Sequence, residues 1–594
     1  MLTLFLAFYS SLKGRMMYSY FMPVHNPEIA AMLYKLADLL EIRGENPFRI
    51  RAYRSAARLI DELPKSVAEM LKEGEDLTEL PGIGAALAEK IKTIVTTGKL
   101  PQLDRLEKKM PTALTELLMI EGLGPKRIKI LHEKLHIKNL DDLKKELDRG
   151  TIRDLHGFGE KTEKLIFIGL KSFTKGKRRM KLADAEKIAV PLLDYLKKAP
   201  DIKKVDIAGS FRRRKETVGD LDILAVATKG RKVVDYFTKF EEVLRVISHG
   251  TTRSTVFLRS GIQVDLRVVP EKSYGAAMHY FTGSKSHNIT IRKMALKRNL
   301  KVNEYGVYKG NRQVAGKTEK EFYAFFNMPY IEPELRENRG ELEAALKGQL
   351  PKLITLKDIR GDLHCHTNAT DGKYSLEAMA EAAQTRGYRY MAITDHSKHL
   401  SVARGLDKKR LIEQIKMIDK LNGKLKGFTI LKGIEVDILE NGQLDLPDSI
   451  LKELDLTVCS VHYKFNLSEK RQTERILRAM DNPYFNILGH PSGRLIGRRD
   501  PYSVNIERII DAVKTNGCLL EINAQPNRLD LDDTHCKMAK DLGIKMVVST
   551  DAHSINQLAN IKFGIDTARR RWLEKKDVIN TYPLTELKKL LRRK

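Results

Sequence analysis

Three patterns of apolar and polar positions follow one another along the chain. Between residues 23 and 175, apolar side chains recur every three or four positions, as in 85–95, which predicts a series of amphipathic helices. Around 218–224 and 263–269, apolar and polar residues alternate instead, which predicts strands. From about residue 359 onward, short apolar runs that end in polar residues are separated by helix-like segments. The chain is therefore expected to form several domains, of which the first is all-helical.

A glycine turn occurs three times in the helical region. Residues 80–84, 120–124 and 155–159 each read apolar-x-Gly-apolar-Gly, and each precedes a helix-like segment. The glycines allow a tight turn, after which the first N–H groups of the next helix can meet a DNA phosphate, as in a helix-hairpin-helix. One such turn serves helix packing as often as DNA binding, but three on a basic chain favour non-specific DNA binding. The predicted DNA-binding glycines are Gly82, Gly84, Gly122, Gly124, Gly157 and Gly159.

Composition also indicates nucleic acid as the partner. The 594 residues include 106 Lys and Arg against 77 Asp and Glu, a net charge of +29 that points to a polyanion, either nucleic acid or an acidic membrane surface. No apolar run approaches the length of a membrane span, which favours nucleic acid. The four cysteines form no C-x-x-C pair, so we expect a cytoplasmic protein. Residues 1–22 do not fit a signal peptide, and we expect a disordered extension or a start codon assigned too early.

Two carboxylates stand two residues apart on the first predicted strand of the middle region. Because side chains two apart on a strand share a face, Asp220 and Asp222 are expected to lie side by side. They repel each other unless a cation lies between them, and oxygen ligands suit Mg²⁺. Asp265, on the second predicted strand, completes a set that could hold two Mg²⁺ for in-line phosphoryl transfer. The alternative is the solvated face of an edge strand. Upstream, Gly209, Ser210 and the basic residues after them could receive a triphosphate.

The run 209–224 resembles the nucleotidyltransferase signature of family X DNA polymerases, and the likeness continues in order at 280–284 and 303–306. The resemblance implies an α+β palm followed by a thumb. It also implies that Asp220, Asp222 and Asp265 are catalytic ligands of Mg²⁺ or Mn²⁺, with Asp265 nearest the attacking 3′ hydroxyl. The family's nucleotide-binding positions correspond here to Gly209, Ser210, Arg213, Tyr280, Phe281, Gly283, Asn288 and Arg292. Lys285 and Gln263 depart from the vertebrate pattern, which leaves fidelity and rate open.

The first hairpin region is similar to the small 5′-phosphate-binding domain of the same family, which carries a lyase activity in some members. Lyase chemistry needs a lysine that forms a Schiff base with the aldehyde of an abasic sugar. Lys90 stands at the family's nucleophile position, and Arg49 and Tyr53 stand at its 5′-phosphate-binding positions. Ala86 and Thr78 replace further lysines of the best-known members, so a solvated Lys90 without catalytic role is an equal alternative.

Histidines gather in the last part of the chain, where eight of the fifteen lie between His364 and His553. His364 and His366 alternate at the end of a strand-like run, so both imidazoles point one way and can share a metal. Similar clusters end the apolar runs at 391–396, 431–436, 458–462, 487–491 and 547–553. Repeated strand–helix units with ligands at the C-terminal ends of the strands predict a β/α barrel with its site on that face.

This constellation strongly resembles the PHP phosphoesterase family, named for polymerases and histidinol phosphatases. The resemblance implies three metal sites, the first made by His364, His366, Glu435 and Asp551, the second by Glu435, His462 and His490, and the third by Asp371, His396 and His553. All nine positions carry a competent ligand. Mixed His and carboxylate sites suit two or three Zn²⁺, Mn²⁺ or Fe²⁺ ions, among which the sequence does not choose. Such a cluster would activate water and clamp a phosphodiester for hydrolysis.

The two resemblances cover nearly the whole chain and predict how it divides. An extension (1–22) is followed by a helical domain with the first hairpin (23–105) and a helical region with the other two hairpins (106–180). After these come a palm (181–270), a thumb (271–335), a linker (336–358) and a distorted β/α barrel (359–594). We expect a monomeric DNA polymerase of base excision repair type, which uses dNTPs to fill short gaps and binds gapped or nicked duplex DNA, its 5′ phosphate and its 3′ ends. The barrel is expected to act as a 3′ exonuclease or phosphoesterase, while lyase and abasic-site endonuclease activities stay open. The alternatives are a small-molecule phosphatase and a non-catalytic DNA end-binding scaffold. Nucleotide incorporation on gapped DNA separates the three.

Overall fold

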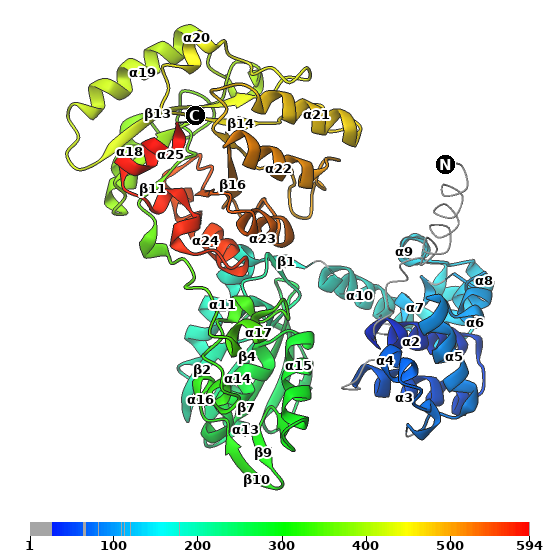
Figure 1. Ribbon diagram of the computed structural model, residues 1–594. Helices are drawn as coiled ribbons and strands as arrows, with labels where there is room; N and C mark the ends of the chain where they lie inside the picture. The colour runs from blue at the N-terminus through cyan, green and yellow to red at the C-terminus, as the bar shows by residue number, and fades with distance from the viewer. Residues whose placement is uncertain are drawn as a thin grey trace, which may run out of the picture. The chain divides into compact units, whose positions relative to one another are not determined.

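The computed structural model describes residues 26–592 apart from 63–66, 81, 109, 112, 119, 121 and 178, so the expectation for residues 1–22 lies outside the described residues. The chain divides into two units, 1–178 and 179–594, close to the predicted end of the helical region at residue 180. In Figure 1 the first unit runs from blue to cyan and the second continues to red. Within the described part of the chain, no helix is both long and apolar enough to cross a membrane.

The first unit consists of helices, as the sequence predicts. They are α2 (Asn26–Arg43), α3 (Pro47–Glu62), α4 (Val67–Lys72), α5 (Ala85–Thr97), α6 (Pro101–Glu107), α7 (Leu114–Leu117), α8 (Pro125–Leu135), α9 (Leu140–Arg149) and α10 (Gly159–Lys177). One apolar cluster contains Leu33, Tyr53 and Ile91, and a second contains Ile42 and Leu131. Because α2 carries both Leu33 and Ile42, one long helix joins the two predicted helical domains.

The three glycine turns share one backbone feature. Gly82, Gly122 and Gly157 have φ angles of 80°, 91° and 85°, in the left-handed region that glycine adopts without steric cost. The second glycine of the first two turns, Gly84 or Gly124, is extended and caps the helix that follows. The third turn differs, because α10 begins at its second glycine, which also has a positive φ.

A five-stranded sheet of order β2-β4-β7-β6-β5 forms the predicted palm. Its strands are β2 (Ile202–Ile207), β4 (Asp220–Ala227), β5 (Val243–His249), β6 (Arg253–Leu258) and β7 (Gln263–Val269), and its flanking helices are α11 (Leu182–Leu196), α13 (Gly230–Phe237) and α14 (Tyr274–Thr282). Strand β4 is buried on both faces: Leu221 and Ile223 pack with α11 and α13, and Leu224 and Val226 pack with α14. It is therefore a central strand, which rules out the solvated edge strand considered above.

The predicted thumb contains α14, α15 (Lys285–Leu296), β8 (Lys301–Asn303), β9 (Gly306–Lys309), β10 (Arg312–Ala315) and α16 (Glu319–Phe325). The structure corrects the prediction that residues 336–358 form a linker. α17 (Glu341–Leu346) packs into the thumb core, and both Arg336 and Glu341 are completely buried. Arg336 pairs with Glu319, and Glu341 Oε1 lies 2.6 Å from His287 Nδ1. The charged side chains of this predicted linker thus have buried partners.

Seven parallel strands in sequential order form the C-terminal barrel. They are β11 (Gly361–Asp362), β12 (Tyr390–Ile393), β13 (Thr429–Asp437), β14 (Leu456–Ser460), β15 (Ile487–Leu488), β16 (Leu519–Asn523) and β17 (Met546–Ser549). Around them lie α18 (Leu376–Thr385), α19 (Lys408–Asn422), α21 (Glu469–Met480), α22 (Ile506–Asn516), α23 (Asp533–Asp541), α24 (Ile561–Arg570) and α25 (Leu584–Leu591). The His366 N–H donates to the Ala552 carbonyl at 2.9 Å, which joins the chain after β11 to the chain after β17 and nearly closes the barrel. The predicted barrel is confirmed, with seven strands.

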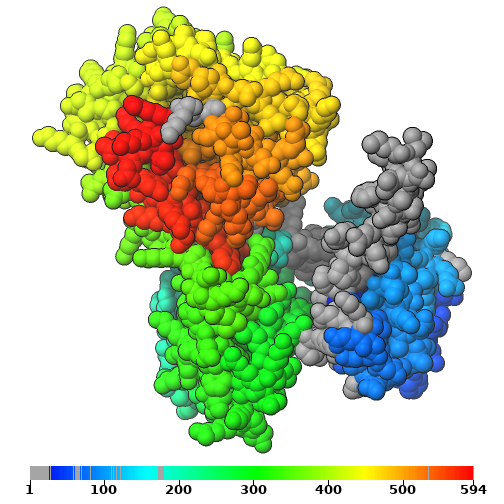
Figure 2. Space-filling model, in the orientation of Figure 1, coloured from blue at the N-terminus to red at the C-terminus, as the bar shows by residue number. Residues whose placement is uncertain are grey.

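The barrel packs directly on the palm within the second unit. Leu529 and Phe563 of the barrel belong to the apolar cluster of the palm. Around them, Arg494 pairs with Glu216 at 2.6 Å, and Lys562 with Glu186 at 2.6 Å. In the space-filling view, the red and orange surface of the barrel lies directly against the green surface beneath it (Figure 2).

Candidate metal centres and nucleic-acid contacts

Three aspartates of the palm meet on the paired strands β4 and β7. Asp220 and Asp222 lie on one face of β4, and the parallel register places Asp265 of β7 directly opposite Asp222. The Asp265 carboxylate accepts hydrogen bonds from the Thr255 hydroxyl at 2.5 Å and from the Gln263 side chain at 2.8 Å, which fix its orientation. The structure thus brings together the three acids that the sequence singled out.

The chain itself does not neutralise this cluster. Burial, followed by the charges of Asp220 and Asp265, raises the pKa of Asp222 to about 7. Near pH 7, a bound proton therefore competes with any cation for the site. A divalent ion satisfies all three carboxylates at once, and their oxygen donors suit Mg²⁺ or Mn²⁺.

The loop 208–216 before β3 (Thr217–Val218), which contains the single helical turn α12 (Gly209–Arg212), passes very close to Asp222. Gly209 has a φ of 63°, and a Cβ atom there would lie 2.1 Å from Asp222 Oδ2, so only glycine fits. The neighbouring Ser210 hydroxyl is buried without a hydrogen-bond partner in the described part of the chain. A buried hydroxyl without a partner is costly, and a phosphate oxygen would satisfy it.

Most of the other predicted nucleotide-binding residues lie on α14, on α15 and in the short turn between them. Arg213 links this segment to the loop, because its guanidinium donates to the Thr282 carbonyl at 2.7 Å and to Glu337 at 2.9 Å. The Asn288 amide donates to the carbonyl oxygens of Tyr280 and Gly283. Half-buried side chains complete the predicted set on the same two helices: Phe281 on α14 and Arg292 on α15.

Glu435 of β13 stands at the centre of the histidines of the barrel. The distances from its carboxylate oxygens to the facing ring nitrogens are 2.9 Å for His396, 3.0 Å for His490, 3.2 Å for His462, 3.4 Å for His364 and 3.6 Å for His366. Burial by itself raises the pKa of Glu435, but His462, His364 and His396 together hold that pKa well below its ordinary value. The buried carboxylate is therefore ionised and faces five imidazoles.

The other eight predicted ligands of the barrel form one continuous cluster with this carboxylate. Asp551 Oδ1 lies 3.2 Å from His366 Nε2, and Asp371 Oδ2 lies 3.3 Å from His553 Nε2. Ligand atoms within 4.8 Å of one another form three groups: His366, Asp371, His396 and His553; His364, His366 and Asp551; and His396, Glu435 and His462. His366 and His396 each belong to two groups, a sharing that the sequence did not predict.

Unsatisfied nitrogen atoms show that this cluster suits metal ions. Nε2 of His364, both ring nitrogens of His366 and Nδ1 of His396 are buried, and although carboxylate oxygens lie 2.9–4.0 Å from them, none of these nitrogens makes a hydrogen bond in the described part of the chain. Buried polar atoms are rarely left in that state. Imidazole and carboxylate are the donor set of Zn²⁺, Mn²⁺ or Fe²⁺ sites, so the residues fit a cluster of such ions.

Sequence analysis missed the carboxylates that orient these ligands. Glu521 of β16 accepts a hydrogen bond from the His490 N–H at 2.6 Å and lies 2.7 Å from His364 Nδ1. Asp437 lies 3.1 Å from His462 Nδ1. Both could have been found in the sequence, because Glu521 also ends an apolar run and Asp437 stands two residues after Glu435 on the same strand.

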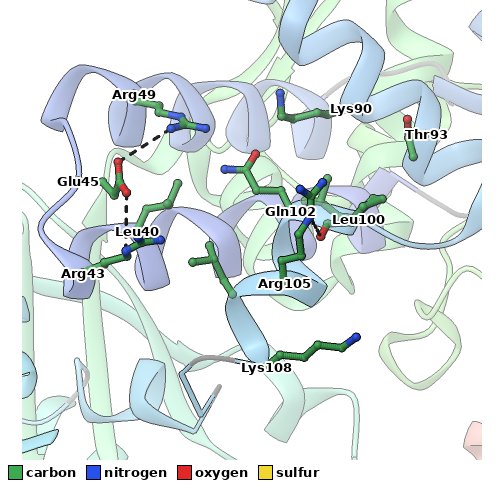
Figure 3. A pocket seen from close by; sticks show the side chains of 12 residues that line it. Leu40, Arg43, Glu45, Arg49, Lys90, Thr93, Leu100, Gln102, Arg105 and Lys108 are labelled. Carbon is green, nitrogen blue, oxygen red and sulfur yellow. Dashed lines mark hydrogen bonds and ion pairs between the residues drawn. The ribbon is translucent and has the colours of Figure 1, made fainter. Parts of the chain in front are cut away.

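A basic pocket of the first unit contains the predicted lyase lysine. The pocket has a volume of about 710 Å³, and its basic lining residues are Arg43, Arg49, Lys90, Arg105 and Lys108. Figure 3 shows these side chains around one space, to which α2, α3, α5, α6 and the residue after α6 each contribute. Tyr53, the other predicted phosphate-binding residue, does not line the pocket itself. It is buried in the core, and its hydroxyl donates to Gln102, which lines the pocket.

Comparisons with known proteins match nearly the whole chain. Family models match a helix-hairpin-helix domain at 24–100, a SAM-like helix-hairpin-helix tandem at 114–172, a DNA polymerase beta thumb at 277–337 and a PHP domain at 362–525. The DNA polymerase/3′-5′ exonuclease PolX of Bacillus subtilis is 38% identical over 574 residues, 96% of this chain and 100% of that protein. A probable phosphatase of Thermoanaerobacter sp. is 31% identical over 231 residues, 37% of this chain and 89% of that protein. DNA polymerase lambda of Arabidopsis thaliana is 27% identical over 349 residues, 53% of this chain and 62% of that protein.

Asp222→Asn should change activity and stability in opposite directions. Loss of a metal ligand should lower nucleotide addition to a DNA primer on the order of a thousandfold or more. The folded-state pKa of Asp222 is raised to about 7, so at pH 8 the wild-type fold carries an unfavourable charge that the variant lacks. Without metal at pH 8, the variant should melt about 2–4 °C higher, and the gain should shrink as the pH falls below 7 and vanish only near pH 4.

Primer extension and melting in EDTA measure the two effects, and Asp184→Asn, on the exposed face of α11, is the matched control. Near wild-type extension by Asp222→Asn would show that Asp222 is not a metal ligand.

Glu521→Gln should weaken the metal cluster without removing a ligand. A glutamine holds the His364 ring less firmly, and loss of such a supporting carboxylate costs about 10–100-fold in metal affinity or activity. Metal content after dialysis measures the change. Glu413→Gln, an exposed position on α19, should leave it unchanged. Wild-type retention of metal by Glu521→Gln would contradict the orienting role.

Proposed function

The chain belongs to the family X DNA polymerases that carry a C-terminal PHP domain, and we propose that it fills short gaps in DNA and hydrolyses 3′ ends. Both parts of the chain belong to metal-dependent enzyme classes, and the hairpins and thumb imply DNA and dNTPs as ligands. The observation that supports the proposal is the alignment of Asp222 with Asp265 close to Gly209, because these carboxylates could hold a metal next to a loop suited to a phosphate.

At the polymerase site, each residue has a separate task. We assign the triphosphate to the backbone around Gly209, the hydroxyl of Ser210 and the guanidinium of Arg213. Arg213 now pairs with Glu337, so an incoming triphosphate would exchange places with that carboxylate. Asp265, oriented by Thr255 and Gln263, would hold the metal nearest the primer 3′ hydroxyl. When bound, Mg²⁺ or Mn²⁺ supplies the positive charge that stabilises in-line phosphoryl transfer.

The helical unit would hold the DNA without reading its sequence. Three turns with the same left-handed glycine present N–H groups towards a backbone phosphate, which positions a duplex independently of its bases. The basic pocket of the first unit is suited to the 5′ phosphate at the far side of a gap. A monomer on gapped or nicked DNA is the simplest assembly consistent with this arrangement.

In the barrel, the chain supplies an ionised bridge and its surrounding imidazoles. Glu435 would bridge ions because one carboxylate faces five histidines, and Asp371 and Asp551 would complete the sites. Two or three Zn²⁺, Mn²⁺ or Fe²⁺ ions, when bound, would activate water for attack on a 3′-terminal phosphodiester or phosphate. Arg528, with its Nε 3.6 Å from Asp551 Oδ2, would place a positive charge beside the substrate phosphate.

The relatives named probable phosphatases favour small-molecule phosphate hydrolysis as a second candidate, but they match only 37% of the chain. DNA is favoured as the substrate because helical hairpins on the same chain raise the local concentration of 3′ ends at the barrel.

Two single variants should separate the proposed activities. On a gapped duplex with a labelled primer, Glu435→Ala should abolish shortening from the 3′ end and leave extension, whereas Asp222→Asn should do the reverse. His366→Ala should reduce shortening less completely, because Glu435 faces more ligands than any other residue of the cluster. Denaturing gels in Mg²⁺ and then Mn²⁺ give both rates. A wild-type protein that extends but never shortens DNA in Mg²⁺, Mn²⁺ or Zn²⁺ would refute the role of the barrel, and one that never extends would refute gap filling.

Borohydride should trap an adduct between Lys90 and DNA with a 5′-terminal abasic sugar. Lys90 is half-buried in the basic pocket, where Arg49 can hold the 5′ phosphate next to the amine. Lys90→Ala should therefore lose the adduct, whereas Lys92→Ala, an exposed position on the same helix, should keep it. Equal trapping by both variants would exclude Lys90 as the nucleophile, and no trapping by the wild type would exclude the lyase.

A further inference from the structure

A cavity of about 340 Å³ lies where the palm meets the barrel. Its walls come from the loop after α12 (Gly209–Arg212), from the chain before β1 (Met180–Lys181) and from the barrel at the end of α24. Figure 1 shows α24 next to β1 at this junction. Six lining residues are basic: Arg179, Arg214, Lys215, Arg494, Arg570 and Arg571. The two acidic lining residues have other tasks, because Glu216 pairs with Arg494 at 2.6 Å and Asp532 caps α23.

Two of these arginines are held rigidly in the wall. Arg570 and Arg571 are only 6% and 2% exposed. Arg570 Nη1 donates to the Arg213 carbonyl at 2.7 Å, and Arg571 Nε donates to the Asp532 carbonyl at 2.9 Å. These carbonyl acceptors fix the orientation of both guanidinium groups, and Glu337 Oε1 lies 3.3 Å from Arg570 Nη1. Both groups therefore reach the cavity preorganised, which lowers the entropic cost of binding an anion.

Lys215 is another basic residue of the cavity whose charge has no direct partner in the described part of the chain. Its half-buried amine has no hydrogen-bond or ion-pair partner within the described part of the chain. Burial lowers the pKa of Lys215; Glu337 opposes this change, and Arg570, Arg213 and Arg179 add to it. The protein thus holds the ammonium group of Lys215 where burial and the neighbouring arginines disfavour its positive charge. A bound anion would offset that cost in free energy.

We propose that this cavity binds a small phosphate-bearing anion of the size of pyrophosphate or a nucleoside phosphate. The planar guanidinium groups match phosphate oxygens, and the hydroxyls of Thr217, Thr534 and Thr567 line the same space. The volume lies at the lower end of small-molecule sites and leaves no room for a duplex. Arg570 of the barrel donates to the backbone carbonyl of Arg213, which directly follows α12 in the palm. An occupant of the cavity would therefore contact both the palm and the barrel.

The single tryptophan of the chain gives a local readout, because Trp572 directly follows Arg571. The full-length protein is titrated with inorganic pyrophosphate at constant ionic strength while the Trp572 emission is recorded. We expect a saturable change whose half-saturation rises roughly tenfold or more in Lys215→Ala, the size of one lost charge-assisted contact. Lys215→Arg should retain binding, and Lys187→Ala, an exposed position on α11, is the matched control.

Melting curves of the unliganded variants show whether each is folded, and Lys215→Ala should melt no lower than the wild type because it removes a disfavoured charge. Equal half-saturation in Lys215→Ala and Lys187→Ala, or no saturable change in the wild type, overturns the proposal. A 12-nucleotide single strand that saturates the same emission change when pyrophosphate does not would also overturn it, because the site would then take DNA phosphates.

Discussion

Buried polar groups whose charge or hydrogen bonding the polypeptide does not satisfy by itself are the constraint on which both candidate active sites depend. In the palm, Asp220, Asp222 and Asp265 are held together although burial, followed by their mutual repulsion, raises the pKa of Asp222 to about 7. In the barrel, buried nitrogens of His364 and His366 lack hydrogen bonds in the described part of the chain. Each arrangement costs stability without metal, and the surrounding core must offset that cost because the net stability of a domain is small. A bound cation would make the contribution of each site to the stability of the fold favourable.

Strand geometry supplies the precision that these sites require. Strand β4 is buried on both faces, so neither it nor its partner β7 can shift register without moving apolar side chains out of the core. That register places Asp222 opposite Asp265. In the barrel, parallel strands end at one rim, where Glu435 and its histidines meet. Glu521 of strand β16 holds the His364 ring from the side away from Glu435.

The contact between palm and barrel joins the two sites through charged residues. Arg570 at the end of α24 contacts both the carbonyl of Arg213 and the carboxylate of Glu337. Glu337 also pairs with the Arg213 guanidinium. Arg213, which is proposed to hold the triphosphate, therefore contacts Arg570 of the barrel through its own carbonyl and, indirectly, through Glu337. A substitution in this contact is therefore able to influence nucleotide addition without touching the nucleotide.

The sequence by itself determined the local chemistry of this protein. Alternation places Asp220 and Asp222 on one face, glycine permits the left-handed turns at Gly82, Gly122 and Gly157, and polar residues that end apolar runs mark the ligands of the barrel. These features follow from neighbours in the chain, so they could be predicted without a fold.

Tertiary structure alone decided which distant charges meet. Arg336 and Glu341 lie in the segment predicted to be a linker, yet both are buried against partners from the thumb. Tyr53 stands at a predicted phosphate-binding position, but its ring lies in the core and only Gln102 connects it to the pocket. Sequence cannot anticipate such cases, because whether a charged or polar side chain is solvated or buried depends on a partner that only the folded chain brings near it.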